Sequence, residues 1–304
     1  MQIKDFKIDH QNRELTQHKT KLLPLACYKT AIHQNVHGYI PLHWHEEVQF
    51  VFVLEGVIRF QVNEQEIIVE EQQGLFINSQ CLHGAKNELN SNGIYICLNV
   101  YPSFLLVPEL FSAYVTPYIQ ATNLDHIKME NSTAWGKEAC EHIVTIYELL
   151  AKEGEFYEIH ISKQLTSLWL LLISNASPVT DPANSRKNKR IRDMLSWIHL
   201  HYDETVSLEN IAKAGLLSKS ECCRYFKSIL GLSPMQYVNY YRIEKSLSLL
   251  QNTDFSVTEI AYKVGFNGSS YYIEQFKKSM HITPKSYQKS MKMKMQETEK
   301  GRYD

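Results

Sequence analysis

Three histidines and a glutamine carry the most distinctive side-chain chemistry in the first hundred residues. His43 and His45 are two positions apart, Gln49 follows four positions later, and His83 comes after further strand-like segments. Neutral imidazoles and an amide offer hydrogen-bond donors and acceptors, which suits a ligand with many hydroxyl groups. Imidazole nitrogens are also common ligands of zinc and other transition metals. The cluster therefore predicts a ligand pocket or a metal site.

The surrounding stretch is typical of a small β-sandwich or barrel. Short β-branched and aromatic runs separated by turn residues cover 48–54, 57–62, 67–69, 74–77 and 94–98. Side chains two positions apart on a strand point to the same face, so His43 and His45 are expected to share one. We expect a barrel over about 20–100, followed by helices over about 103–174, where the apolar periodicity becomes helical.

The order of these residues resembles the cupin pattern, in which two histidines, an acidic residue and a later histidine point into a barrel. Gln49 stands at the acidic position. An amide oxygen is neutral and a weaker metal ligand than a carboxylate, although three imidazoles can still bind zinc. The cluster can thus be an effector pocket, a metal site or a set of structural histidines. We favour an effector pocket lined by His43, His45, Gln49 and His83, with no metal and no organic cofactor.

A repeat occupies the last third of the chain. Ser207–Ala212 matches Ser256–Ala261, 49 positions later. Further matches, 50 positions apart, pair Gly215 with Gly265, Ser220 with Ser270, Phe226-Lys227 with Phe276-Lys277, Ser233-Pro234 with Thr283-Pro284, and Tyr237 with Tyr287. Repeated units do the same physical job. A short helix, a glycine turn and a second helix in each copy are typical of a helix-turn-helix that binds DNA.

Capping residues predict the helix boundaries in each copy. Ser218 with Glu221, and Ser256 with Glu259, form capping-box patterns. We expect the second helix of each copy at about Ser218–Leu230 and Ser269–Met280. A long helix from about Met235 to Leu250 would join the copies rigidly, because Pro234 stands at a first helical position. Held in this way, the two second helices would enter successive major grooves, about 34 Å apart.

These positions together resemble the signature of the AraC/XylS-type transcription regulators, over about residues 188–290. The matching positions are Arg242-Ile243, Ser246, Leu249-Leu250, Ile260-Ala261, Val264-Gly265-Phe266, Tyr271-Tyr272, Phe276-Lys277-Lys278, Thr283-Pro284 and Tyr287. Three positions depart from the family: Ser246 replaces the usual Ala, His281 the usual Gly, and Gln288 the usual Arg. The resemblance implies a DNA-binding regulator that works with RNA polymerase and responds to a small effector, first of all a sugar or related metabolite.

The groove-facing side of each second helix follows from its apolar periodicity. In the first helix the side opposite the apolar face carries Lys219, Ser220, Cys223, Arg224 and Lys227, and the matching positions in the second are Ser269, Ser270, Ile273, Glu274 and Lys277. We expect Arg224 to contact a guanine edge and Lys227 to contact phosphate. Glu274 has two possible roles. Its carboxylate accepts a hydrogen bond from cytosine N4, or it is a solvated or internally paired charge.

Charge is segregated along the chain, although the formal net charge is −1. Residues 186–304 carry 20 Lys+Arg against 12 Asp+Glu, a difference of +8, whereas residues 1–185 carry 12 against 21, a difference of −9. A cationic region gains affinity for DNA by releasing counterions from the phosphates. We therefore expect DNA binding in the last third and another role for the acidic part.

Length and composition predict two domains in a cytoplasmic protein. We expect an effector-binding and dimerisation domain at 1–174, a linker of prolines and small polar residues at 175–188, a DNA-binding domain at 189–290 and a flexible tail at 291–304. The sequence shows no apolar signal run and no segment long enough to span a bilayer. The six cysteines show neither metal-ligand spacing nor a disulfide framework.

The expected fold is an α+β multidomain protein, with an N-terminal cupin-like β-barrel, a helical dimerisation segment and a C-terminal all-α double helix-turn-helix. We interpret the chain as a homodimeric regulator that binds double-stranded DNA and a small effector, and not as an enzyme or a membrane protein. Two alternatives are a cupin metalloenzyme with an accessory DNA-binding domain and a ligand-independent DNA-binding regulator. Metal analysis tests the first, and ligand-dependent thermal stability tests the second.

Overall fold

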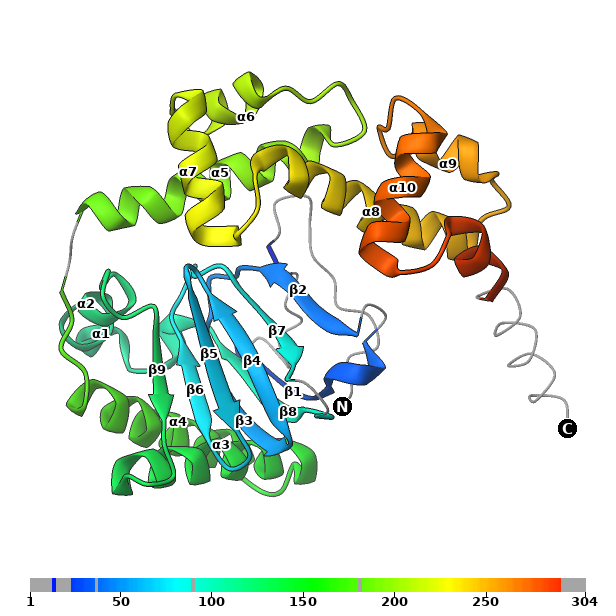
Figure 1. Cartoon of the computed structure of the whole chain (residues 1–304). Helices are drawn as coiled ribbons and strands as arrows, with labels where there is room; N and C mark the ends of the chain where they lie inside the picture. Colours follow the sequence, from blue (N-terminus) through cyan, green and yellow to red (C-terminus); the bar gives the residue numbers. More distant parts are fainter. Residues whose placement is uncertain (1–12, 15–22, 36–37, 89–90, 180–181, 291–304) are drawn as a thin grey trace, which may run out of the picture. The chain divides into compact units, whose positions relative to one another are not determined.

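The computed structural model describes residues 13–14, 23–35, 38–88, 91–179 and 182–290 (Figure 1). The tail expected at 291–304 lies outside the described residues. The chain divides into two compact units, Met1–Arg192 and Asp193–Asp304, and each is described by itself. Among the described residues, no helix has both the length and the apolar character required to cross a bilayer.

Two antiparallel sheets form the first unit. The five-stranded sheet has the order β1 (Leu25–Ala31), β8 (Ile94–Val100), β3 (Val48–Glu55), β6 (Gly74–Ile77) and β9 (His126–Met129). The four-stranded sheet has the order β2 (Tyr39–His43), β7 (His83–Asn87), β4 (Val57–Val62) and β5 (Gln65–Glu70). In the described part of the chain no strand pairing joins the two sheets, so the expected barrel is a sandwich of two sheets.

Strand β3 is apolar on both faces because it lies between two layers. Val51 and Val53 pack into the core between the sheets, together with Phe60 of β4. Phe50 points the opposite way and packs in a second core on the outer face of the five-stranded sheet. Gln49 shares the face of Val51 and Val53, since alternate strand residues point the same way. Its amide therefore lies between the sheets.

Helices cover the outer face of the five-stranded sheet. The 3₁₀ helices η1 (Ile32–Gln34) and η2 (Pro102–Phe104) are short, and the α-helices of this unit are α1 (Pro108–Tyr114), α2 (Thr116–Ile119), α3 (Ala134–Lys152) and α4 (Tyr157–Ser174). Ile143 of α3 and Trp169 of α4 share the outer core with Phe50. Trp169 Nε1 also donates a hydrogen bond to the carbonyl of Tyr114, at 2.9 Å. Strand β9 interrupts the region expected to be wholly helical.

The second unit contains the repeat as two helix pairs. Helix α5 (Pro182–His201) begins inside the stretch expected to be a linker, and it is followed by α6 (Leu208–Ala214), α7 (Lys219–Leu230), α8 (Pro234–Asn252), α9 (Val257–Lys263) and α10 (Ser269–Met280). Residues 284–290 are again helical. The capping boxes at Ser218 and Ser256 are both formed. The expected second helices and the long connecting helix are thus present.

A buried arginine on α8 makes two hydrogen bonds to the loop that follows α5. Arg242 Nε donates to the carbonyl of Tyr202 at 2.7 Å, and its Nη2 donates to the carbonyl of Glu204 at 2.8 Å. Gly265, at φ +88°, lies against the same loop, where an added Cβ would be 2.4 Å from the Tyr202 oxygen. Both the positive φ and the close approach require glycine.

The three departures from the family pattern each have a structural setting. Ser246 Oγ accepts a hydrogen bond from Tyr272 Oη at 2.9 Å and donates to the carbonyl of Ile243 at 2.6 Å. Gln288 Nε2 donates to the carbonyl of Phe255 at 3.1 Å. His281 is the C-cap of α10 and has φ 60°, a left-handed conformation that glycine adopts more easily.

Candidate effector pocket and DNA-binding surface

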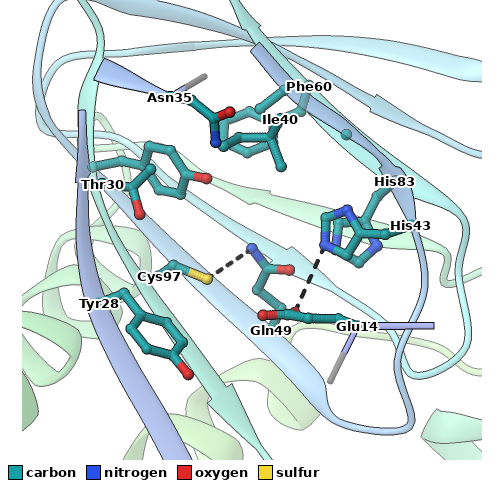
Figure 2. A pocket seen from close by; sticks show the side chains of 13 residues that line it. Glu14, Tyr28, Thr30, Asn35, Ile40, His43, Gln49, Phe60, His83 and Cys97 are labelled. Atoms are coloured by element: carbon teal, nitrogen blue, oxygen red, sulfur yellow. Dashed lines mark hydrogen bonds and ion pairs between the residues drawn. The ribbon is translucent and has the colours of Figure 1, made fainter. Parts of the chain in front are cut away.

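The histidine cluster is assembled by one strand pair and the turn that follows it. His43 of β2 and His83 of β7 are direct cross-strand partners, and their ring centroids are 4.2 Å apart. His45, two residues beyond His43, has its ring centroid 4.9 Å from that of His83. All three are almost fully buried. The structure thus brings together the three histidines singled out in the sequence (Figure 2 labels His43 and His83).

Backbone carbonyls orient all three imidazole rings. The Nδ1 atoms of His43, His45 and His83 lie 2.8, 2.9 and 2.8 Å from the carbonyl oxygens of Pro41, Glu47 and Cys81, respectively. A carbonyl oxygen can only accept, so each neutral ring carries its proton on Nδ1. The Nε2 atoms of His43 and His83 then present lone pairs, whereas His45 Nε2 faces the Gln49 amide oxygen. Among the described residues, His83 Nε2 is buried without a hydrogen-bond partner.

A carboxyl group from far along the sequence completes the cluster. Glu14 is buried, and its Oε2 lies 3.8 Å from the Nε2 atoms of both His43 and His45. Asn99 Nδ2 donates to the same oxygen at 3.1 Å. The Glu14 backbone N–H donates to the carbonyl of Trp44 at 2.9 Å, which fixes the residue beside the cluster. Sequence reasoning missed Glu14, because it lies in a polar stretch without strand-like periodicity.

Burial controls the protonation of the cluster. Burial, aided by the neighbouring His45, lowers the pKa of His43 to about 3. The pKa of His83 is lowered by burial and by the two other histidines, and burial also lowers that of His45. Burial, aided by the nearby Glu47 carboxylate, raises the pKa of Glu14 to about 8, against the opposing hydrogen bond from Asn99. The three rings are therefore neutral at physiological pH.

The Gln49 amide lies between the histidine cluster and Cys97. Its Oε1 lies 3.2 Å from His45 Nε2. Its Nε2 donates to the sulfur of Cys97 at 3.1 Å (Figure 2). Gln49 and Cys97 line a small cavity together with Glu14, His43, His83, Tyr28, Thr30, Asn35, Ile40, Phe60, Gly84, Ala85 and Tyr95. Of the four residues expected to line a pocket, His45 is the one outside this lining. The volume of the cavity is about 20 Å³. That is room for about one water molecule, so a larger ligand requires the lining to move.

The donor set of the cluster fits a divalent transition metal. One ring nitrogen from each of His43, His45 and His83 lies within 4.8 Å of the other two. Histidines that ligate metals characteristically donate their second N–H to a carbonyl or carboxylate, as all three do here. A carboxylate next to three imidazoles is also a normal combination around zinc and its neighbours. The residues could thus hold a metal ion, although Gln49 occupies the acidic position of the cupin pattern.

The predicted groove-facing residues lie on the accessible sides of α7 and α10. Lys219, Ser220, Arg224, Lys227, Ser270, Ile273, Glu274 and Lys277 are exposed, while Cys223 and Ser269 are half-buried. The apolar sides are buried through Cys222, Phe226 and Ile229 in α7 and through Tyr272 and Phe276 in α10. Two of the cations have contacts within the protein: Lys219 pairs with Glu209 at 3.2 Å, and Lys227 Nζ donates to the carbonyl of Gly231 at 2.9 Å.

Comparison with known proteins gives the same two parts. A helix-turn-helix family model matches residues 211–290, and a cupin-domain model matches residues 32–99. The chain is 50% identical over 288 residues to the uncharacterized HTH-type transcriptional regulator YdeC of Bacillus subtilis (strain 168), covering 94% of this chain and 99% of that protein. It is 25% identical over 248 residues to the HTH-type transcriptional activator RhaS of Klebsiella pneumoniae (strain 342), covering 81% and 86%. A solved structure of ToxT from Vibrio cholerae O395 aligns with a TM-score of 0.43 and 13% identity, over 87% of this chain and 96% of that one.

Proposed function

The chain belongs to the AraC-type helix-turn-helix transcription regulators and carries a cupin domain in its N-terminal half, and from this premise we propose that a ligand bound between the two sheets controls how it binds DNA. The family relationship makes the protein a DNA-binding transcription regulator. The observation that carries the ligand proposal is the buried group of three imidazoles, one amide and one carboxyl, gathered around a small cavity. Buried polar groups are normally satisfied by partners, and His83 Nε2 has none among the described residues.

The effector we propose is a small polar metabolite, and a sugar is the first candidate. Thr30, Asn35 and Gln49 line the cavity with groups that can bind hydroxyls. A sugar is far larger than the present cavity, so its entry requires Glu14 or its neighbours to move outward. Arg13 forms an isolated bridge with Trp44, and Glu14 donates its N–H to the Trp44 carbonyl and accepts from Asn99, so an outward movement of Glu14 would break these two hydrogen bonds.

A binding role fits this pocket better than catalysis. A metalloenzyme needs an open coordination position and space for a substrate beside the metal. The cavity volume is about 20 Å³, and four potential ligands already surround it. We therefore propose a sensor rather than an enzyme.

Helices α7 and α10 are the proposed recognition helices. Each is the second helix of one copy of the repeat, and each exposes polar side chains opposite a buried apolar face. Helix α8, with 19 residues, is about 28 Å long and joins the copies without a flexible break. Two recognition helices on such a connector suit adjacent major grooves of one DNA face.

Assembly into a homodimer is proposed to use the outer faces of α1 and α4. Ile159 and Leu170 are 67% and 59% exposed, and because they are eleven residues apart they lie on one side of α4. Leu110 and Tyr114 are likewise exposed on α1. Large apolar side chains exposed together on a surface mark protein interaction sites. The remaining proposed partner is RNA polymerase, contacted by the DNA-bound dimer.

The test combines ligand screening with DNA binding. A DNA site is first selected from a random-sequence library with the full-length protein. Sugars and related metabolites are then screened by thermal shift, because a ligand that binds the folded state must raise its stability. A hit that also changes the affinity for the selected DNA in a gel-shift assay supports the proposal. A regulator that binds its DNA identically with every ligand that stabilises it would refute effector control.

A further inference from the structure

Another cavity of the first unit lies on the outer side of the five-stranded sheet, and it shares no lining residue with the cavity beside the histidine cluster. Its volume is about 470 Å³, which is in the range of small-molecule pockets. We infer that it binds a small zwitterion with an apolar side chain, of the α-amino acid class, between Lys137 and Glu141 of α3. The inference goes beyond the proposed function, because it assigns a second ligand site.

Helix α3 supplies one wall of this cavity through side chains three or four residues apart, which lie on one side of a helix. They are Lys137, Cys140, Glu141, Val144 and Thr145. The other wall is formed by Phe52 of β3, by Gln72 in the turn before β6, and by Asn131 in the loop between β9 and α3. Three separate parts of the sequence thus surround the cavity.

The inner part of the cavity is apolar. Phe52 and Val144 are half-buried and pack against the core on the outer face of the sheet. Cys140, which lines the cavity with them, is buried. Burial raises the pKa of its thiol to about 12, so the group is uncharged and packs as a small apolar side chain. An apolar part of a ligand is stabilised by covering this surface.

Two opposite charges stand at the rim of the cavity, one helical turn apart. Lys137 and Glu141 are both exposed, and within the described residues neither takes part in an ion pair. A lysine four residues before a glutamate is the weaker order for such a pair. Glu148 and Lys152, in the favourable order on the same helix, do pair, at 3.3 Å. The charges of Lys137 and Glu141 are therefore available to a ligand.

These two charges select the class of ligand. A simple carboxylate would be attracted by Lys137 but repelled by Glu141, and a simple amine would meet the reverse. A zwitterion satisfies both, with its carboxylate toward Lys137 and its ammonium toward Glu141. Its side chain then covers the apolar inner part of the cavity. Gln72 and Asn131, which are hydrogen bonded to each other at 3.3 Å, add uncharged polar groups on the opposite wall.

The test uses the full-length protein and follows ligand binding by calorimetry. L-leucine is compared with L-leucinamide, which lacks the carboxylate, N-acetyl-L-leucine, which lacks the ammonium, and glycine, which lacks the apolar side chain. We expect L-leucine to bind more tightly than the other three. Lys137→Gln should weaken binding of L-leucine and N-acetyl-L-leucine by about three- to tenfold, but not that of L-leucinamide. Glu141→Gln should weaken L-leucine and L-leucinamide to a similar extent, but not N-acetyl-L-leucine.

Lys152→Gln and Glu138→Gln are matched controls, because both residues lie on α3 outside the cavity, and they should leave every affinity unchanged. Circular dichroism confirms that each variant is folded. The methyl NMR signals of Val144 give a second readout and should shift when L-leucine binds. Absence of L-leucine binding, unshifted Val144 signals, or equal losses for all ligands in both cavity variants would each overturn the inference. Effector control of DNA binding is judged separately, by the ligand screen and the gel shift.

Discussion

The phenol of Tyr272 donates a hydrogen bond to the hydroxyl of Ser246, 2.9 Å away, inside the core of the second unit. Ser246 lies on α8 and is fully buried, and its hydroxyl donates a hydrogen bond to the carbonyl of Ile243. The serine that replaces the family's usual alanine thus has a buried partner. Its hydroxyl satisfies a tyrosine that would otherwise have a buried donor without an acceptor.

Ser246→Ala should destabilise the second unit by about 1–3 kcal/mol, because it leaves the Tyr272 hydroxyl unsatisfied. Tyr272→Phe should cost about 0.5–1.5 kcal/mol, and the double variant should cost less than the sum of the two. Native-state hydrogen exchange of the α8 amides measures these free energies in the full chain. Strictly additive effects would show that the hydrogen bond contributes nothing to stability.

His281→Gly should stabilise the second unit by about 0.5–1 kcal/mol, since glycine adopts a left-handed C-cap without the steric penalty of a side chain. His281 has φ 60° at the end of α10, and Gly231 has φ 68° at the matching end of α7. Gly231→Ala makes the opposite change at the matching position and should destabilise the second unit by a similar amount. Thermal unfolding of both variants checks the pair, and a destabilising His281→Gly would indicate that the imidazole makes a compensating contact.

Arg224→Ala should weaken specific DNA binding by about 1–3 kcal/mol and relax the preference at one base pair. Lys227→Ala should weaken binding to all sequences alike and reduce the salt dependence, because it removes a phosphate contact. Fluorescence anisotropy on the selected site and on single-base variants, at several salt concentrations, separates the two effects. Unchanged affinity and unchanged sequence preference for Arg224→Ala would remove α7 from the role of recognition helix.

Leu170→Glu should shift the protein from dimer to monomer, because it places a charge at the interface proposed on α4. Ile68→Glu is a suitable control, since Ile68 is also exposed, at 42%, but lies on β5. Sedimentation velocity at micromolar concentration distinguishes the species. A wild type that is already monomeric, or a Leu170→Glu variant that stays dimeric, would contradict the proposed interface.

His45→Ala should abolish the response to the effector while leaving effector-free DNA binding nearly intact. The histidine lies in the sandwich of the first unit, and the helix-turn-helix pairs form their own core in the second. A reporter assay with the identified effector and a gel shift without it measure the two properties. A normal response in this variant would make the histidine structural and place the effector elsewhere.

The second unit could be predicted closely from the sequence because its signals are local. Ser218 and Glu221 cap α7 with groups only three residues apart, and the same is true of Ser256 and Glu259 for α9. Their capping pattern is visible in any short window. The family resemblance, the double helix-turn-helix and the cupin-like fold were all confirmed.

The first unit was predicted less completely because its decisive contacts are distant in sequence. Strand β7 contains His83, Gly84, Ala85, Lys86 and Asn87, with no β-branched residue, so it gave no strand signal. Gln49 could be placed on an inward face by alternation along β3, whereas no periodic pattern leads to Glu14. Its hydrogen bond to Asn99 spans 85 residues. Chain folding alone brings these two side chains together.

Strand β1, at one edge of its sheet, cannot pair until its neighbour β8 has been synthesised. Leu25 pairs with Val100, the far end of the neighbouring strand β8, 75 residues later. At ribosomal rates of about 5–20 residues per second, the nascent strand waits about 4–15 s for that neighbour to be made. The paired helices of the second unit need no such wait, because α6 and α7 are separated by only a few residues. The cupin half of this regulator is therefore the part most dependent on protection while it is being translated.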